Sequence, residues 1–128
     1  MRTSEVPGLT SATLAVLPAL ATHRCDCETG TYFVEELEDT EMAHLAEHVA
    51  LELMVLAGSP RTLSGRTTWD WARDGRGVFE VALGYDDDLV CIAALEAALE
   101  TVDGLVDGCA PDVGATVARL VALRGTAR

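Results

Sequence analysis

The sequence predicts an α+β fold, with a split βαβ-type antiparallel sheet and helices packed on one face. Two observations lead to this prediction. Segments rich in β-branched and aromatic residues alternate with longer segments whose apolar residues recur at helical spacing. Their order is strand, helix, strand, strand, helix, which is the order of a split βαβ layout. We expect one domain over residues 1–128, because this length suffices for a core without disulfide or metal staples.

The first half of the chain holds one predicted strand and one long predicted helix. Residues 9–21 are mildly apolar and are compatible with a strand or a short helix. Residues 31–37 (TYFVEEL) are typical of a strand. A helix over 40–58 begins with Asp39 or Thr40 as its cap and ends at Gly58. Its expected buried face comprises Met42, Leu45, Ala46, Val49, Leu53 and Leu56.

The second half predicts a hairpin and two helices. The strand candidates 65–72 and 77–85 are joined by the short polar loop 73–76. Acidic residues 86–88 then open a helix that runs from Asp87 to about Val106, and a last helix starts at Pro111-Asp112. The expected packing residues of these two helices are Leu89, Ile92, Ala93, Leu95, Ala97, Leu99, Val113, Val117, Leu120 and Val121.

The net charge of −12 argues against nucleic-acid binding, which requires a basic face. It is compatible with a cationic substrate or simply with solubility. No apolar run approaches the ~20 residues of a membrane span. Glu5 and the Pro7-Gly8 break argue against a signal peptide. We therefore expect a cytoplasmic protein whose four cysteines are reduced thiols.

The helix over 40–58 carries an H-x-x-E-H pattern at His44, Glu47 and His48. Imidazoles at i and i+4 lie on one helical face, about 5–6 Å apart at Cβ, which suits capture of one metal ion. In inverse-zincin peptidases the same order supplies two zinc ligands and a general base. The pattern indicates a Zn²⁺ site, although an alanine-rich helix can also carry histidines for other reasons.

A catalytic zinc needs a third protein ligand, which the pattern itself does not supply. Glu52 lies two turns beyond His44, too far along the axis to share the ion comfortably. In the expected layout both long helices run roughly the same way, so the start of the second lies near the histidines. Asp88 and Glu96 are then the best candidates, with Asp87 behind them; the alternative for all three is a solvated helix surface.

Two further features have both a functional and a plain interpretation. His23, Cys25 and Cys27 could form a small metal site, although a loop with ordinary thiols explains them as well, because structural zinc requires four ligands with wider spacing. Arg66 could face a substrate or decorate a strand.

Several motifs together resemble the N-terminal domain of cyanophycin synthetases. They are H-x-x-E-H-x-A-L-E-L at 44–53, G-R-T at 65–67, Tyr85 followed by three acids, and H-x-C at 23–25. The sequence departs from the family pattern at Gly30-Thr31, Thr68 and Cys91. The ATP-grasp and Mur-ligase-like domains of the synthetase are absent, so we expect the N-terminal domain standing free, unable to make polymer by itself.

The resemblance implies binding of cyanophycin, a poly-aspartate that carries arginine on each side chain, and in some members internal hydrolysis at a zinc-dependent site that produces primers. It assigns the following roles: His44, His48 and Asp88 as metal ligands, Glu47 as the base, Arg66 as a contact for a carboxylate or the developing oxyanion, and Glu52 as a residue that orients a histidine or holds a substrate guanidinium. The alternatives are a non-catalytic accessory subunit for a separately encoded ligase, or a structural zinc protein. A homo-oligomer is compatible with either.

Overall fold

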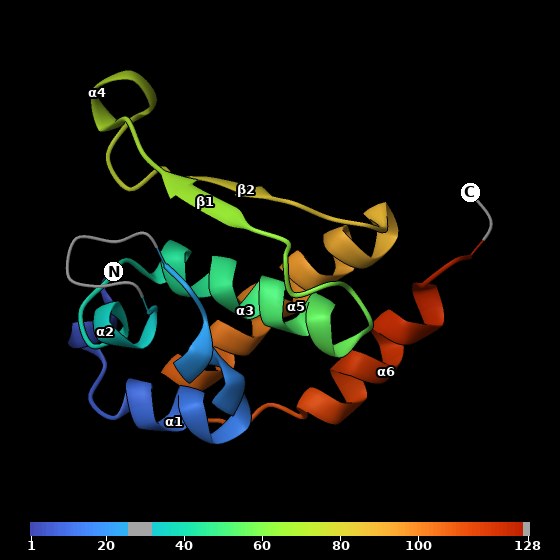
Figure 1. Cartoon of the computed structure of the whole chain (residues 1–128). Helices are drawn as coiled ribbons and strands as arrows, with labels where there is room; N and C mark the ends of the chain where they lie inside the picture. Colours follow the sequence, from blue (N-terminus) through green and yellow to red (C-terminus); the bar gives the residue numbers. More distant parts are fainter. Residues whose placement is uncertain (26–31, 127–128) are drawn as a thin grey trace.

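The structure is a computed structural model that describes residues 1–25 and 32–126 (Figure 1). A hairpin of two strands lies over a layer of helices, which confirms the α+β class and the antiparallel pairing. Along the chain the described elements are η1 (Thr3–Glu5), α1 (Leu9–Val16), η2 (Pro18–Thr22), α2 (Val34–Leu37), α3 (Met42–Leu56), β1 (Gly65–Thr68), α4 (Trp71–Asp74), β2 (Glu80–Leu83), α5 (Asp88–Val106) and α6 (Val113–Leu123). Residues 9–21, compatible with strand or helix from sequence, are helical.

Helix α3 lies at the centre of the molecule and confirms the helix expected over 40–58. Leu45, Val49 and Leu53 are completely buried among the core residues of α1, α5 and α6. Two details of the prediction were wrong. Glu41 occupies the N-cap without a side-chain cap bond, and Leu56 is 44% exposed, because the last turn of α3 buries Leu53 and Met54 and leaves the side with Leu56 to solvent.

The expected hairpin is confirmed, with shorter strands than the sequence suggested. β1 and β2 pair from Gly65↔Leu83 to Thr68↔Glu80. A single helical turn, α4, occupies the tip, and Asp70 caps it by accepting a hydrogen bond from the backbone N–H of Arg73. The described sheet consists of these two strands alone, with α3 against one face.

The strand expected over residues 31–37 is wrong: Val34–Leu37 form the short helix α2. Phe33 and Leu37 are both fully buried, and a helical turn lets residues four apart reach the same core. Tertiary packing therefore overrides the β propensity of the segment. Extended pairing here is limited to one isolated bridge between Arg24 and Tyr32; Thr31 lies outside the described residues.

Helix α5 begins beside the end of α3 and runs back along it, so the expected common direction is wrong (Figure 1). The junction is fixed by Ser59 Oγ, which donates to Asp86 at 2.6 Å, and by Arg124, which bonds both Asp86 and the Ala57 carbonyl. The packing faces differ in part from the expected ones: Ile92 and Leu99 of α5 and Val121 of α6 are more than half exposed. The expected Ala97 is buried, and the other buried apolar residues of α5 are Val90, Ala94, Ala98, Val102 and Leu105.

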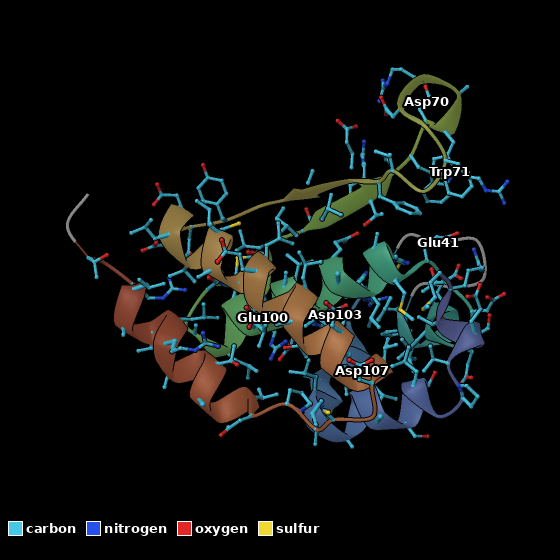
Figure 2. All side chains as sticks on the ribbon, turned by 180° about the vertical axis from the view of Figure 1, so that it is seen from behind. Glu41, Asp70, Trp71, Glu100, Asp103 and Asp107 are labelled. Carbon is cyan, nitrogen blue, oxygen red and sulfur yellow. The ribbon has the colours of Figure 1, made fainter. Side chains whose placement is uncertain are left out.

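The remaining surface of α5 is acidic. Glu100, Asp103 and Asp107 lie along one exposed stripe of the helix, on the side seen in Figure 2. None of the helices in the described ranges combines the length and the hydropathy that a membrane crossing requires.

Candidate metal centre

The H-x-x-E-H residues lie in the first half of α3, beneath the hairpin. Glu47 and His48 are almost completely buried, at 4% and 3% exposure. Thr67 of β1 donates its hydroxyl hydrogen to Glu47 Oε1 at 2.7 Å. Gly65 permits this close approach, because a Cβ atom at that position would lie 2.9 Å from Glu47 Oε2 and 3.0 Å from the Ala82 carbonyl oxygen. The G-R-T segment, residues 65–67, therefore packs β1 directly against Glu47.

Cys25 completes a group of three donors with the two histidines. One ligand atom from each of Cys25, His44 and His48 can be chosen so that all lie within 4.8 Å of one another, and Cys25 Sγ is 3.4 Å from His44 Nε2. Zn–N and Zn–S bonds of about 2.0–2.3 Å place tetrahedral donors roughly 3–4 Å apart. Thiolate and imidazole are donors that zinc accepts, so the residues present fit a zinc ion with modest adjustment.

A chain of hydrogen bonds links Glu52, His23 and His48. The Glu52 carboxylate accepts from His23 Nε2 at 2.9 Å, so when His23 is neutral its Nδ1 is bare. In that state His48 Nδ1 donates to His23 Nδ1 at 3.0 Å, which leaves His48 Nε2 without a hydrogen. That nitrogen lies 3.8 Å from Glu47 Oε2. Neutral imidazole with a bare nitrogen, held by a partner on the other ring nitrogen, is the form that binds metals.

His44 is held in the same way by its neighbours. Its Nδ1 lies 2.9 Å from Thr40 Oγ1, which leaves Nε2 toward Cys25. Phe33 supports both rings: it meets His44 edge-on and stacks on His48 at 3.9 Å with an interplanar angle of 12°. The two imidazoles are therefore oriented before any metal arrives.

Burial dominates the electrostatics of the site. It lowers the pKa of His48 to about 2, with the neighbouring histidines adding to the effect, and it lowers the pKa of His44 as well. Burial raises the pKa of Glu47, against the opposing effects of the Thr67 hydrogen bond and of His23. The imidazoles are thus kept neutral, and Glu47 is a stronger base than an ordinary glutamate.

The site opens into a large cleft of about 1170 Å³ between the hairpin, α3 and the N-terminal segment. His44, Glu47 and His48 line it, together with Cys25, Arg66 and Trp69. Arg66 is exposed on β1, so it borders the cleft without touching the buried donors. The buried donors are therefore accessible from the cleft.

The structure does not bring Asp88 to the histidines. Asp88 is exposed in the first turn of α5, at the junction where Ser59 contacts Asp86, and it lies outside both the cleft lining and the donor group. Asp87 caps α5 and accepts from Val90 and Gly125, while Glu96 lies farther along the same helix. The placement failed because it assumed that α3 and α5 run the same way.

Glu52 is buried beneath the donor group, where it orients His23 rather than facing the metal position. Burial raises the pKa of Glu52, but hydrogen bonds from His23 and Arg61 outweigh that effect and lower it overall. Sequence reasoning separated the H-x-C motif from H-x-x-E-H, although the motif holds both the orienting His23 and the donor Cys25. Cys27, the other cysteine of that predicted knot, lies outside the described residues.

Comparison with known proteins identifies the family of the chain. Residues 1–107 match the family model described as the cyanophycin synthase-like N-terminal domain. The chain belongs to this family. It is 34% identical over 105 residues to the cyanophycin synthetase of Crocosphaera subtropica. Identity is 33% over 105 residues for that of Synechocystis sp. and 33% over 106 residues for that of Trichormus variabilis.

These relatives are much longer proteins. Each match covers 81% of this chain but only 12%, 12% and 11% of the respective synthetase. The shared part therefore corresponds to one region of the synthetases, and it contains the whole donor group and the hairpin.

Proposed function

We propose that this protein is a zinc-dependent hydrolase that cleaves amide bonds within cyanophycin or a related arginine-bearing polymer, producing shorter chains. The observation that carries the proposal is the grouping of Cys25, His44 and His48 beside the buried carboxylate of Glu47, at the base of an open cleft. A module that only bound polymer would gain nothing from a buried base beside two neutral imidazoles and a thiol. Membership of the cyanophycin synthase-like family supports the choice of polymer.

In this proposal Cys25, His44 and His48 hold the ion, and Cys25 replaces the Asp88 expected from sequence. When bound, zinc supplies a Lewis acid that polarises an amide carbonyl and lowers the pKa of water. Thr67 holds Glu47 Oε1, which leaves Oε2 on the side of His48. Glu47 takes a proton from the attacking water at Oε2 and later passes it to the leaving amine.

Arg66 is proposed as a substrate contact at the rim of the cleft. Its guanidinium is exposed on β1, one residue from both Gly65 and Thr67, which touch Glu47. A guanidinium there can pair with a polymer carboxylate in two parallel hydrogen bonds. The developing oxyanion is the alternative partner.

The test is a comparison of wild type with Glu47→Gln. Wild type is expected to bind close to one zinc per chain and to shorten cyanophycin, and Glu47→Gln is expected to keep the metal while losing the shortening. Glu96→Gln is the matched control, because Glu96 is exposed on α5, outside the cleft lining, and should change neither quantity. If wild type and Glu47→Gln shorten cyanophycin equally, the hydrolase proposal is wrong.

A second candidate is a non-catalytic cyanophycin-binding subunit that serves a separately encoded ligase. It is favoured by the relatives, which are synthetases of which this chain matches about an eighth. This candidate predicts tight polymer binding with no change in chain length, and faster ligation when the protein is added to a ligase. Polymer shortening that depends on Glu47 would reject it.

A further inference from the structure

Three aromatic side chains gather at the tip of the hairpin. The ring centroids of Trp69 and Phe79 lie 5.6 Å apart, those of Trp71 and Phe79 5.8 Å apart, and those of the two indoles 6.5 Å apart. Trp69 is nevertheless 53% exposed. Such a cluster far from the main core buries little area, so an exposed indole here calls for a function.

The two tryptophans have different roles in the cluster. Trp71 is held internally, because its Nε1–H donates to the Val78 carbonyl at 3.1 Å and the Arg76 guanidinium lies 5.9 Å from its ring centroid. Trp69 has aromatic neighbours on the hairpin and an exposed remainder. The tip thus already shows one guanidinium over one indole, and it leaves a second indole available.

Trp69 also belongs to the cleft that contains the candidate metal centre. It lines that cleft with His44 and Glu47, although it follows β1 of the hairpin and they belong to α3. Figure 2 shows Trp71 on the hairpin tip at the same end of the molecule as Glu41, another residue of the cleft lining. One member of the aromatic cluster therefore lines the cleft that holds the buried donors.

The cleft lining carries charges of both signs, on a chain whose net charge is −12. Its carboxylates are Glu36, Glu41 and Glu47, and its arginines are Arg2, Arg24, Arg61 and Arg66. Arg2 pairs with Glu41 at 3.0 Å and Arg61 with Glu52 at 3.0 Å. The positive charge of these two arginines is offset locally, so they oppose an incoming guanidinium less than an unpaired arginine would.

We propose that Trp69 is a binding residue for the guanidinium groups of the polymer, which stack on its exposed indole while the main chain crosses the cleft toward Glu47. Planar guanidinium groups stack on tryptophan faces more favourably than on any other side chain. The identity of the polymer rests on the proposed function, but the guanidinium preference follows from the indole face and its exposure.

The test measures binding without hydrolysis. Cyanophycin is titrated into Glu47→Gln protein, with binding followed by calorimetry, and Trp69→Ala and Trp69→Leu are added in that background. A cation–π contact of this kind predicts a loss of about two- to thirtyfold in affinity for both variants, with Trp69→Phe in between. Tyr85→Ala is the matched control, because Tyr85 is 57% exposed and lies outside the cleft lining.

The outcomes separate this inference from the hydrolase proposal. Wild-type affinity in Trp69→Ala, or full affinity in Trp69→Leu, overturns the guanidinium role, the second because it leaves only a general apolar contact. An equal loss in Tyr85→Ala also overturns it. If Trp69 controls affinity but wild type leaves the polymer intact, the inference stands and only the hydrolase proposal fails. If polymer shortening requires Glu47 but polymer affinity does not depend on Trp69, the hydrolase proposal stands and the guanidinium inference fails.

Discussion

Replacing Cys25 with alanine tests the ligand set directly. Its Sγ lies 3.4 Å from His44 Nε2, within the group whose donor atoms are all less than 4.8 Å apart. Four ligands share about 10–16 kcal/mol in structural zinc sites, so one ligand carries on the order of 3 kcal/mol. At about 1.4 kcal/mol per tenfold, Cys25→Ala should weaken zinc binding by about two orders of magnitude.

The assay is a competition titration against a chromophoric chelator at fixed pH and salt. Asp88→Ala provides the decisive comparison, because Asp88 is the ligand expected from the sequence and the structure places it in the exposed first turn of α5. Cys91→Ala controls for loss of a thiol, since Cys91 is half-buried on α5. Both controls should bind zinc like wild type. A Co²⁺-loaded protein should also lose its sulfur-to-metal charge-transfer band in Cys25→Ala alone.

Two results would refute this reasoning. Wild-type zinc affinity in Cys25→Ala would remove the thiol from the ligand set. A large loss in Asp88→Ala, with Cys25→Ala unaffected, would show that the sequence-based choice was right and that the packing of α5 in solution differs from the antiparallel arrangement beside α3.

Three further substitutions follow from contacts around the site and the helix junction. Gly65→Ala should destabilise the fold by about 1–3 kcal/mol in urea unfolding, because the new Cβ meets the Glu47 carboxylate at 2.9 Å. Glu52→Gln should weaken zinc binding by about 10–100-fold in the chelator titration, because it removes the carboxylate that orients His23. Asp86→Asn should reduce the loss of stability in acid: its pKa is lowered by its Ser59 hydrogen bond, so its contribution is present above about pH 4 and is lost as the pH falls further.

Each of these has its own control. Gly104→Ala should stabilise by about 0.5–1 kcal/mol, because its Cβ would meet nothing nearer than 3.9 Å inside α5, and a loss there as large as at Gly65 would contradict the steric argument. Glu100→Gln, exposed on α5, should leave zinc affinity unchanged. For Asp86→Asn the difference from wild type in the free energy of unfolding at pH 7 should not exceed about 1 kcal/mol. If the two proteins lose stability identically in acid, the ion pair between Asp86 and Arg124 does not contribute to stability.

The sequence was informative where local signals agree with tertiary packing. Helix α3 combines helical periodicity with a Gly58 stop, and the hairpin combines two strand-like segments with a short polar connection. Both were predicted with the correct residues at their centres. Residues 32–37 show the opposite case, because Phe33 and Leu37 reach the core only when the chain turns, whatever their β propensity.

The third donor could not be located from local signals, because it depends on the direction of α5. A hairpin returns the chain to the side from which it left, so β2 delivers α5 to the end of α3 near Ser59. The spacing of apolar residues within α5 does not indicate its direction relative to α3. The H-x-C motif at 23–25 was visible, but its proximity to His44 arises from the folding of the N-terminal segment over α3, a contact between residues 19 apart in sequence.

Because the donor group is divided between two stretches of chain, metal binding at the proposed site would be coupled to the docking of the N-terminal segment. Residues 1–25 are tied to the start of α3 by Arg2, which bridges Asp39 and Glu41, and at their far end they deliver His23 and Cys25 to the histidines. A ligand that binds only the docked form stabilises it by RT ln(1 + [L]/Kd). Zinc at a hundred times its dissociation constant would therefore stabilise the docked form of residues 1–25 by about 2.7 kcal/mol. The stability of this docking would then depend on the concentration of free zinc.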